Sequence, residues 1–480
     1  MPRIVASGRP LPRELRRRPM SEKVSVISGG TIVTSDGPVR ADLVIRGEKI
    51  ATITTDAADV ASADVIDARG LIVVPGGVDV HTHFREPDPR LVEGFETGTM
   101  AALAGGVTSA IEMPQASPTS STGEHIREKR RLIGEHSLID IALWGGVVGQ
   151  PIEQIQEMID EGIVALKAFM PASSPGFPPA NDQVLLDTFR FLADSGSDIR
   201  FGIHCENDTL MEQGIARMQA AGRKDALAHY ESRPPLVETE AVHRALFFAE
   251  LTGAWLYVCH CASADALALI KAAKARGANV EVETCPQYLS LDLDDLVKHG
   301  PFARCAPALR DRAEVERIWE YVADGTVDVV SSDHCGYTVE EKRAGLDDIW
   351  QSPLGLSGVQ TMYPALFDEI VNKRGLGLER FVELSATNPA KVFALYPRKG
   401  VIQVGSDADL AFYDPNRSWQ AHGDGMLHRN KWTPFEGKTI GASVVKTIVR
   451  GQVAFDLSRP EAVLSRPGDG RFLGRGYGAS

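Results

Sequence analysis

The chain has 480 residues, of which 43% are hydrophobic and 24% are charged, a composition typical of a globular protein with a large core. Its formal net charge of −13 argues against nucleic acid or an anionic membrane surface as a partner. Apolar runs all stay well below the roughly 18 residues of a membrane span, so none is expected.

The first twenty residues carry six arginines and four prolines. They lack the apolar region of a secretory signal and most of the serine of an organelle signal, although a targeting peptide is an alternative. We expect residues 1–21 to be a disordered extension or an over-long start assignment.

Short alternating runs separated by turn residues follow from 22 to 73, in TIVTSDGPVRADLVIRGEKIATI and DVIDARGLIVV. This pattern is typical of antiparallel strands. It returns near the end, in GVIQVGSDADLAFYD and TIGASVVKTIVRGQVAFD. We expect residues 22–73 and 396–480, which include a C-terminal tail, to complete one small β-sandwich.

Residues 74–395 alternate between strand-like and helix-like segments. Helical periodicity follows each apolar run, as in DQVLLDTFRFLADSG, and several of these segments end at glycine. The sequence predicts a (β/α)8 barrel, with a doubly wound sheet as the structural alternative. The eight runs are VDVHTHF, GGVTSAIEMP, IDIALWGGVV, GIVALKAFM, DIRFGIHCE, WLYVCHCA, NVEVETCP and VDVVSSDH.

Polar residues stand at the ends of these runs, where a barrel places its reactive groups. In VPGGVDVHTHFREPD, His81 and His83 alternate along the strand and therefore share one face, with Arg85 next in the series. A histidine packed in the core or a helix cap explains any one of them alone. Together they favour a metal site, with zinc first and manganese, iron or cobalt as alternatives. The six residues are His81, His83, Lys167, His204, His260 and Asp333.

Lys167 lies inside the buried run GIVALKAFM with no acidic residue within four positions. Because burial of an ammonium is costly, a neutral amine is expected there. Such an amine can add carbon dioxide to form a carbamate, whose two oxygens can bridge two metal ions. The alternative is a lysine whose amine reaches solvent from the strand end.

The six cysteines form no CxxC pair, and their sparse spacing in a long chain is typical of reduced thiols. We expect a cytoplasmic protein in which the cysteines are small apolar filler around the site.

Taken together, the motifs resemble the cyclic amidohydrolases, which include dihydroorotases, allantoinases and hydantoinases. The resemblance covers about residues 24–460 and rests on PGGVDVHTHFREP, AALAGGVTSAIEMP, ALKAFM, GIHCEND, YVCHCAS, VETCPQYLSLD, SSDHCG and VGSDADL. It implies a barrel with a β-sandwich built from both chain ends. It also implies two divalent ions, one held by His81, His83 and Asp333 and the other by His204 and His260, with carbamylated Lys167 as the bridge.

These assignments give Asp333 a catalytic role. Two cations lower the pKa of a water enough for it to attack near neutral pH. Asp333 would take the proton of the water and pass it to the departing amide nitrogen. The product is a ring-opened N-carbamoyl compound.

The substrate motifs point in two directions. HFREP resembles dihydroorotases, in which the residue matching Arg85 pairs with the substrate, but Gln115 stands where that pattern has asparagine. The remaining sequence resembles allantoinases and L-hydantoinases, and Ala172 stands where dihydropyrimidinases have a tyrosine. We expect a five-membered cyclic ureide, allantoin or a 5-substituted hydantoin, contacted by Arg85 and Gln115.

Other interpretations remain open at this point. A dihydroorotase-like or dihydropyrimidinase-like substrate is the first, and a non-catalytic structural homologue is less favoured because every ligand position is filled. A metal-dependent deaminase is distinguished by a single metal and no bridging lysine. The relatives suggest a homotetramer or another homo-oligomer.

Overall fold

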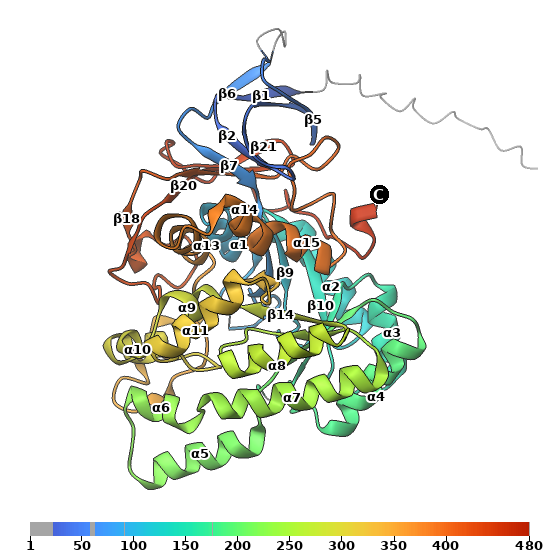
Figure 1. Ribbon diagram of the computed structural model, residues 1–480, viewed down its shortest axis with the longest axis vertical. Helices are drawn as coiled ribbons and strands as arrows, with labels where there is room; N and C mark the ends of the chain where they lie inside the picture. Colours follow the sequence, from blue (N-terminus) through green and yellow to red (C-terminus); the bar gives the residue numbers. More distant parts are fainter. Residues whose placement is uncertain (1–22, 58–62, 91, 175, 480) are drawn as a thin grey trace, which may run out of the picture.

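The computed structural model describes residues 23–57, 63–90, 92–174 and 176–479. The prediction for residues 1–21 lies outside these ranges. A β-sandwich occupies the upper part of Figure 1, and a larger layer of strands and helices lies below it.

The sandwich consists of two sheets built from both ends of the chain, as the sequence predicts. In the larger sheet, β7 lies antiparallel to β17, with Leu410 opposite Pro75. Ile27, Leu43 and Phe412 belong to the apolar core that both sheets bury. One sheet has the order β5 (Lys49–Thr54), β4 (Asp42–Arg46), β1 (Val24–Ser28), β6 (Asp64–Asp67), and the other β21 (Gln452–Asp456), β20 (Ser443–Val449), β17 (Leu410–Asp414), β7 (Ile72–Pro75), β2 (Thr31–Thr34), β3 (Gly37–Arg40).

The barrel sheet is parallel and closes on one segment of chain. β15 pairs with β14, and β16 pairs with β8. Since β15 and β16 both belong to residues 329–335, the same segment forms the first and last strand of the sheet. Closure excludes the doubly wound sheet and confirms the barrel. The strands are β8 (Gly77–His83), β9 (Val107–Glu112), β10 (Asp140–Gly146), β11 (Ala165–Phe169), β12 (Arg200–His204), β13 (Leu256–Val258), β14 (Val280–Thr284), β15 (Val329–Val330) and β16 (His334–Cys335).

Helices cover the outside of this sheet and begin close to the strand ends. Asn207 and Ser263 each lie three residues after a predicted ligand and cap a helix by accepting a backbone N–H. These caps turn the chain away at once and leave the ligands at the strand ends. The long helices are α1 (Phe95–Ala104), α2 (Gly123–His136), α3 (Ile152–Asp160), α4 (Asp182–Asp194), α5 (Asp208–Ala220), α7 (Pro235–Thr252), α8 (Ala264–Ala275) and α11 (Arg312–Ala323).

Shorter elements complete the chain. A two-stranded ribbon, β18 (Trp419–Gln420) and β19 (Thr439–Ile440), lies beside the sandwich, and π-helical turns occupy Asp368–Lys373 and Glu383–Thr387. The short helices are α6 (Ala226–Ser232), α9 (Pro286–Ser290), α10 (Leu293–His299), α12 (Val339–Arg343), α13 (Met362–Phe367), α14 (Gly377–Val382) and α15 (Asn388–Val392).

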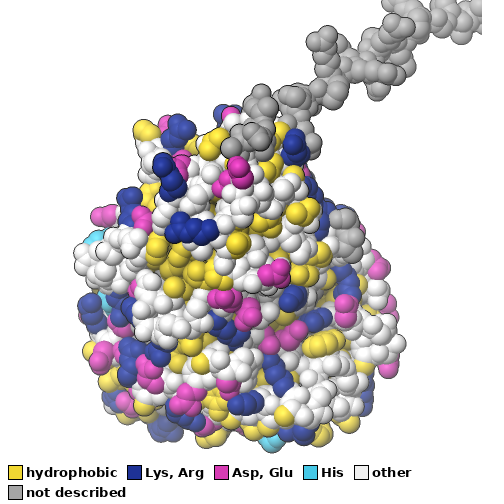
Figure 2. Space-filling model, turned by 45° about the horizontal axis from the view of Figure 1, so that its top comes forward, with side chains coloured by type: hydrophobic (Ala, Val, Ile, Leu, Met, Phe, Trp, Pro, Cys, Tyr) yellow, Lys and Arg dark blue, Asp and Glu magenta, His cyan; other side chains and the backbone are white. Residues whose placement is uncertain are grey.

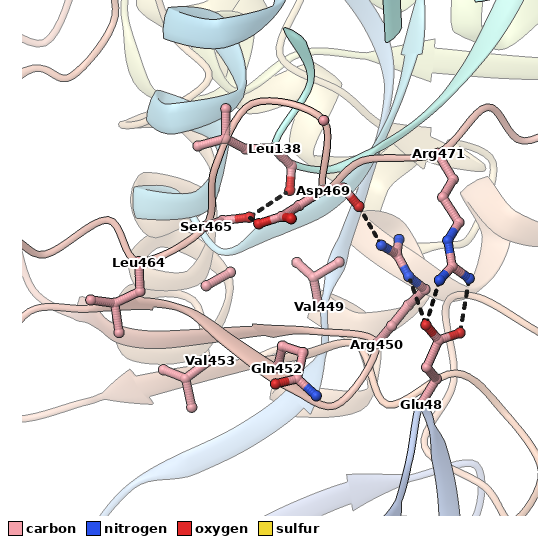
Figure 3. Close-up of a pocket in the computed structure, with 12 residues that line it drawn as sticks. Glu48, Leu138, Val449, Arg450, Gln452, Val453, Leu464, Ser465, Asp469 and Arg471 are labelled. Atoms are coloured by element: carbon pink, nitrogen blue, oxygen red, sulfur yellow. Dashed lines mark hydrogen bonds and ion pairs between the residues drawn. The ribbon is translucent and has the colours of Figure 1, made fainter. Parts of the chain in front are cut away.

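Buried charges join the sandwich to the amino end of the barrel. Lys399 donates to Asp140, the first residue of β10, at 2.7 Å and to Asp409 at 2.5 Å. A cavity of about 550 Å³ lies at this junction, where Arg471 and Glu48 form an ion pair (Figure 3). The sandwich is therefore anchored at the end of the barrel opposite to the predicted ligands.

Charged side chains of both signs lie on the molecular surface, and Figure 2 shows them interspersed over the face that it displays. Within the described ranges, every helix is too short or too polar to cross a membrane.

Candidate metal centre

The six predicted ligands meet at the carboxyl end of the barrel. His81 and His83 end β8, Lys167 lies in β11, and His204 ends β12. His260 lies shortly after the end of β13 at Val258, and Asp333 lies between β15 and β16, directly before His334. Five of the six residues are buried, and the side chain of Asp333 is only 12% exposed.

His81, His83 and Asp333 form the first group. Oδ1 of Asp333 lies 3.2 Å from Nε2 of His81 and 3.3 Å from Nε2 of His83. One ligand atom from each residue lies within 4.8 Å of the other two, a spacing that can hold a metal ion. The chemistry of two imidazoles and a carboxylate suits a divalent cation such as zinc.

His204 and His260 form the second group, with Nδ1 of one 3.0 Å from Nε2 of the other. The ring of Phe169 stacks on His204, with the ring centroids 5.3 Å apart. Nζ of Lys167 lies 4.7 Å from the centroid of Phe169 and has no hydrogen-bond partner among the described residues. The amine of Lys167 lies within electrostatic range of His204 and His260 in this group and of Asp333 in the first group.

Burial sets the protonation of the imidazoles. It lowers the pKa of His83 to about 3 and lowers the pKa values of His204 and His260 below the ordinary range. Burial alone would raise the pKa of Asp333, but the neighbouring His81 and His83 more than offset this and hold that pKa below its usual value. Neutral imidazoles beside an ionised carboxylate are the protonation states that metal ligation requires.

Glu283 and Glu206, which the sequence analysis does not single out, hold these histidines in place. Glu283 accepts from Nδ1 of His81 at 2.8 Å and from the backbone N–H of His260 at 2.9 Å, so it orients both groups. Glu206 lies 2.8 Å from Nε2 of His204. Carboxylates behind ligating histidines fix the ring orientation and leave the other nitrogen for a metal.

Strained backbone marks three residues of this region. Arg85, His260 and Asp333 have φ values of 59°, 34° and 48°, in the left-handed region that disfavours side chains. Such strain persists only where the surrounding contacts hold it, and it is typical of functional sites.

All the predicted ligands except Lys167 line a small cavity of about 120 Å³, next to a larger one of about 870 Å³. Ser173 belongs to the walls of both. Gln115 and Arg85 line the larger cavity, and Nε2 of Gln115 donates to Oγ of Ser173 at 2.5 Å. The two predicted substrate contacts therefore lie in the larger cavity, which meets the cavity of the predicted metal ligands at Ser173.

The position of Arg85 differs from the prediction that it continues the strand face of His81 and His83. β8 ends at His83, and the left-handed conformation of Arg85 breaks the alternation, so the shared strand face does not extend to it. Its Nη2 instead donates to Oη of Tyr337 at 2.7 Å and to Sγ of Cys335 at 2.8 Å. The guanidinium also lies 4.5 Å from the centroid of the Tyr337 ring.

Comparison with known proteins adds independent findings. The sequence pattern of the amidohydrolase family matches residues 72–454. L-hydantoinase of Paenarthrobacter aurescens is 37% identical over 452 residues, which cover 94% of this chain and 98% of that protein. Allantoinase of Escherichia coli (strain K12) is 35% identical over 440 residues, which cover 90% and 95%. The solved structure of L-hydantoinase (dihydropyrimidinase) from Arthrobacter aurescens superposes with a TM-score of 0.90 at 36% identity, covering 95% of this chain and all of that one.

Proposed function

The chain belongs to the amidohydrolase family, and we propose that it hydrolyses the ring amide of a five-membered cyclic ureide, allantoin or a 5-substituted hydantoin. Relatives named L-hydantoinase and allantoinase match over nearly the full length of both chains, which supports a hydrolase of cyclic amides. The observation that carries the proposal is Lys167, a fully buried amine beside two groups of metal-ligand side chains.

The donor atoms fit two divalent ions. His81, His83 and Asp333 would hold one ion, and His204 and His260 the other. Nζ of Lys167 would form a bond to the carbon of CO2 and lose a proton, and the resulting carbamate would supply anionic oxygen ligands beside both groups. Its burial without a hydrogen-bond partner in the described part of the chain supports this assignment. Zinc suits the donor set first, with manganese, iron or cobalt as alternatives.

Asp333 is the proposed catalytic residue. When bound, the ions lower the pKa of a water and polarise the ring carbonyl. The carboxylate of Asp333 accepts a proton from the attacking water as the new C–O bond forms. It returns that proton to the ring nitrogen as the C–N bond breaks, which leaves an N-carbamoyl product. The lowered pKa of Asp333 means that its carboxylate is ionised near neutral pH, which is the state that can accept a proton.

The two cavities support a substrate with a substituent. The ring would occupy the small cavity beside the ligands, and the 5-substituent would extend past Ser173 into the larger one. Arg85 and Gln115 offer hydrogen-bond donors to carbonyl or carboxylate oxygens there. A ureido or carboxylate substituent suits these donors better than an apolar one.

Assembly and location complete the proposal. Leu236, Phe247 and Leu251 of α7 are 64%, 59% and 59% exposed, and we propose that this face contacts a second copy in a homotetramer or smaller homo-oligomer. All six cysteines are buried and unpaired, which supports function in the reducing cytoplasm.

One experiment tests the function. The purified, metal-loaded protein would be screened against allantoin, 5-substituted hydantoins, dihydrouracil and dihydroorotate, with metal content measured in parallel. We expect turnover of a five-membered ureide and two ions per chain. Preference for dihydrouracil or dihydroorotate would contradict the substrate, one ion without a lysine adduct would favour a deaminase, and inactivity on every compound would favour a structural homologue.

A further inference from the structure

The conformation of Asp333 depends on its two neighbours in the chain. Its φ of 48° is strained, so contacts on both sides must hold it. Before it, the backbone N–H of Ser332 donates to Asp79 at 3.0 Å. After it, His334 pairs with Thr82 of β8 and donates its own backbone N–H to Oγ of Ser332.

The side chain of His334 lies between two fixed partners. Its Nδ1 accepts from the backbone N–H groups of Gly358 and Val359 at 3.1 and 3.3 Å, so Nε2 must carry the ring proton. Nε2 faces Oε2 of Glu93 at 3.6 Å. Both atoms are buried, and within the described residues neither has a hydrogen-bond partner, so each is the other's electrostatic partner. His428, whose ring centroid lies 5.6 Å from that of His334, also interacts electrostatically with Glu93.

Glu93 is in turn fixed from its other side. Its Oε1 accepts from the hydroxyl of Thr97 and, at 2.9 Å, from the backbone N–H of Arg429. Nε of Arg429 donates to the backbone carbonyl of Glu93, also at 2.9 Å. A Cβ at Gly336 would lie 2.8 Å from Cβ of Glu93, so the backbone that follows Asp333 packs directly against this carboxylate side chain.

We infer that Glu93 is a positioning residue, which holds His334 and thereby the strained backbone that aims the Asp333 carboxylate. Glu93 joins three segments that are far apart in the chain: its own loop before α1, residue His334 in β16, and residues 428–430. The inference rests on the proposed function, because Glu93 is assigned to position the residue, Asp333, that is proposed to transfer the proton. Glu93 itself does not touch the substrate.

The first variant is Glu93→Gln, which keeps the size of the side chain and removes its charge. Misplacement of a proton-transfer group by less than 1 Å slows turnover strongly. We expect kcat to fall roughly tenfold to hundredfold, while KM changes less than about threefold and two ions per chain remain bound. Because Asp333 is also a proposed metal ligand, kcat is compared at full metal occupancy, and an unchanged kcat under that condition would overturn the inference.

A double-mutant cycle tests whether Glu93 acts through His334. His334→Asn keeps a side-chain acceptor for the backbone N–H of Gly358 but shortens the side chain that faces Glu93. If the inference is right, the double variant Glu93→Gln/His334→Asn is no slower than His334→Asn alone. Losses that multiply would show that Glu93 acts by another route.

Glu436→Gln is the matched control. Glu436 also pairs with a histidine, His422, at 2.7 Å, but that pair is exposed. This variant should keep wild-type kcat, KM and metal content, and a comparable loss of kcat would make the effect of Glu93→Gln non-specific.

A crystal structure of Glu93→Gln separates this inference from the proposed function. The carboxylate of Asp333 should move relative to wild type, and an unmoved carboxylate would overturn the inference. A wild-type protein that hydrolyses no cyclic ureide would refute the function alone, because the position of Asp333 in the variant can still be measured.

Discussion

Arg85→Ala tests how the substrate is selected. The half-buried guanidinium is anchored to Tyr337 and Cys335 by one nitrogen, Nη2. Within the described part of the chain, its hydrogen bonds come from Nη2 alone, Nε has no partner, and Arg85 lines the larger cavity. An oxygen on the 5-substituent can therefore receive a hydrogen bond from a charged donor that is already held in place.

The expected loss follows from that single contact. A hydrogen bond to a charged group contributes about 1.5 to 3 kcal/mol, which corresponds to roughly 10- to 150-fold in kcat/KM. Arg85→Ala also removes the stacking on Tyr337, which lies 4.5 Å from the guanidinium. The loss of stacking acts on the loop and should affect every substrate equally. The ratio of kcat/KM between two substrates therefore isolates the loss of the hydrogen bond to the substrate.

The assay compares kcat/KM for allantoin and for unsubstituted hydantoin in wild type, Arg85→Ala and Tyr337→Phe. Tyr337→Phe removes the hydroxyl that accepts from Arg85 but leaves the guanidinium present. Only Arg85→Ala should lower the kcat/KM for allantoin relative to that for hydantoin, and the metal content should stay unchanged. Equal losses on both substrates, or the same ratio change in Tyr337→Phe, would mean that Arg85 only supports the loop.

Three further predictions follow from the same structure. Lys167→Ala should lose bound metal and activity together, and added short carboxylates should restore part of both. An active wild-type protein without a CO2 adduct on Lys167, as measured by intact mass in bicarbonate, would refute the carbamate. Asp333→Asn should lower kcat far more than it raises KM, because an amide does not accept the proton at neutral pH, and retained turnover would assign the proton transfer elsewhere. Burial lowers the pKa of Lys342 from 10.5 to about 7, so its unfolded-state amine binds a proton that the folded state does not. As the pH rises from about 7 to about 10, the free energy of unfolding of wild type should therefore increase relative to that of Lys342→Met, by at most about 5 kcal/mol. Denaturant unfolding at several pH values measures this difference, and a difference that stays constant with pH would show that Lys342 has an ordinary pKa.

The fold was accessible from the sequence because each barrel strand is an apolar run bounded by a polar end. The same rule located Lys167 and the histidines, since a parallel barrel brings all its strand ends to one face. Closure was not accessible, because periodicity is the same in open and closed sheets. Closure depends on residues 329–335, in which β15 pairs with β14 at one edge of the sheet and β16 pairs with β8 at the other.

The carboxylates behind the histidines show a second limit. Glu281 and Glu283 stand two positions apart in β14, so alternation places them on one face and does not separate their roles. Register separates them: Glu281 bonds to Arg200 at the start of β12, whereas Glu283 bonds to His81 at the end of β8. A difference of two positions along one strand thus decides which glutamate supports the site.

Backbone strain is the part of the site furthest from sequence reasoning. A positive φ is expected at glycine, yet arginine, histidine and aspartate adopt it here at positions 85, 260 and 333. Each costs on the order of 1 to 3 kcal/mol and must be held by contacts made elsewhere. For Arg85 these contacts include Glu112, which accepts its backbone N–H at 2.8 Å, and for His260 they include Glu283 at 2.9 Å. Glu283 thus both orients the ring of His81 and holds the strained backbone of His260, so its substitution should disturb the geometry of the site before it disturbs the fold.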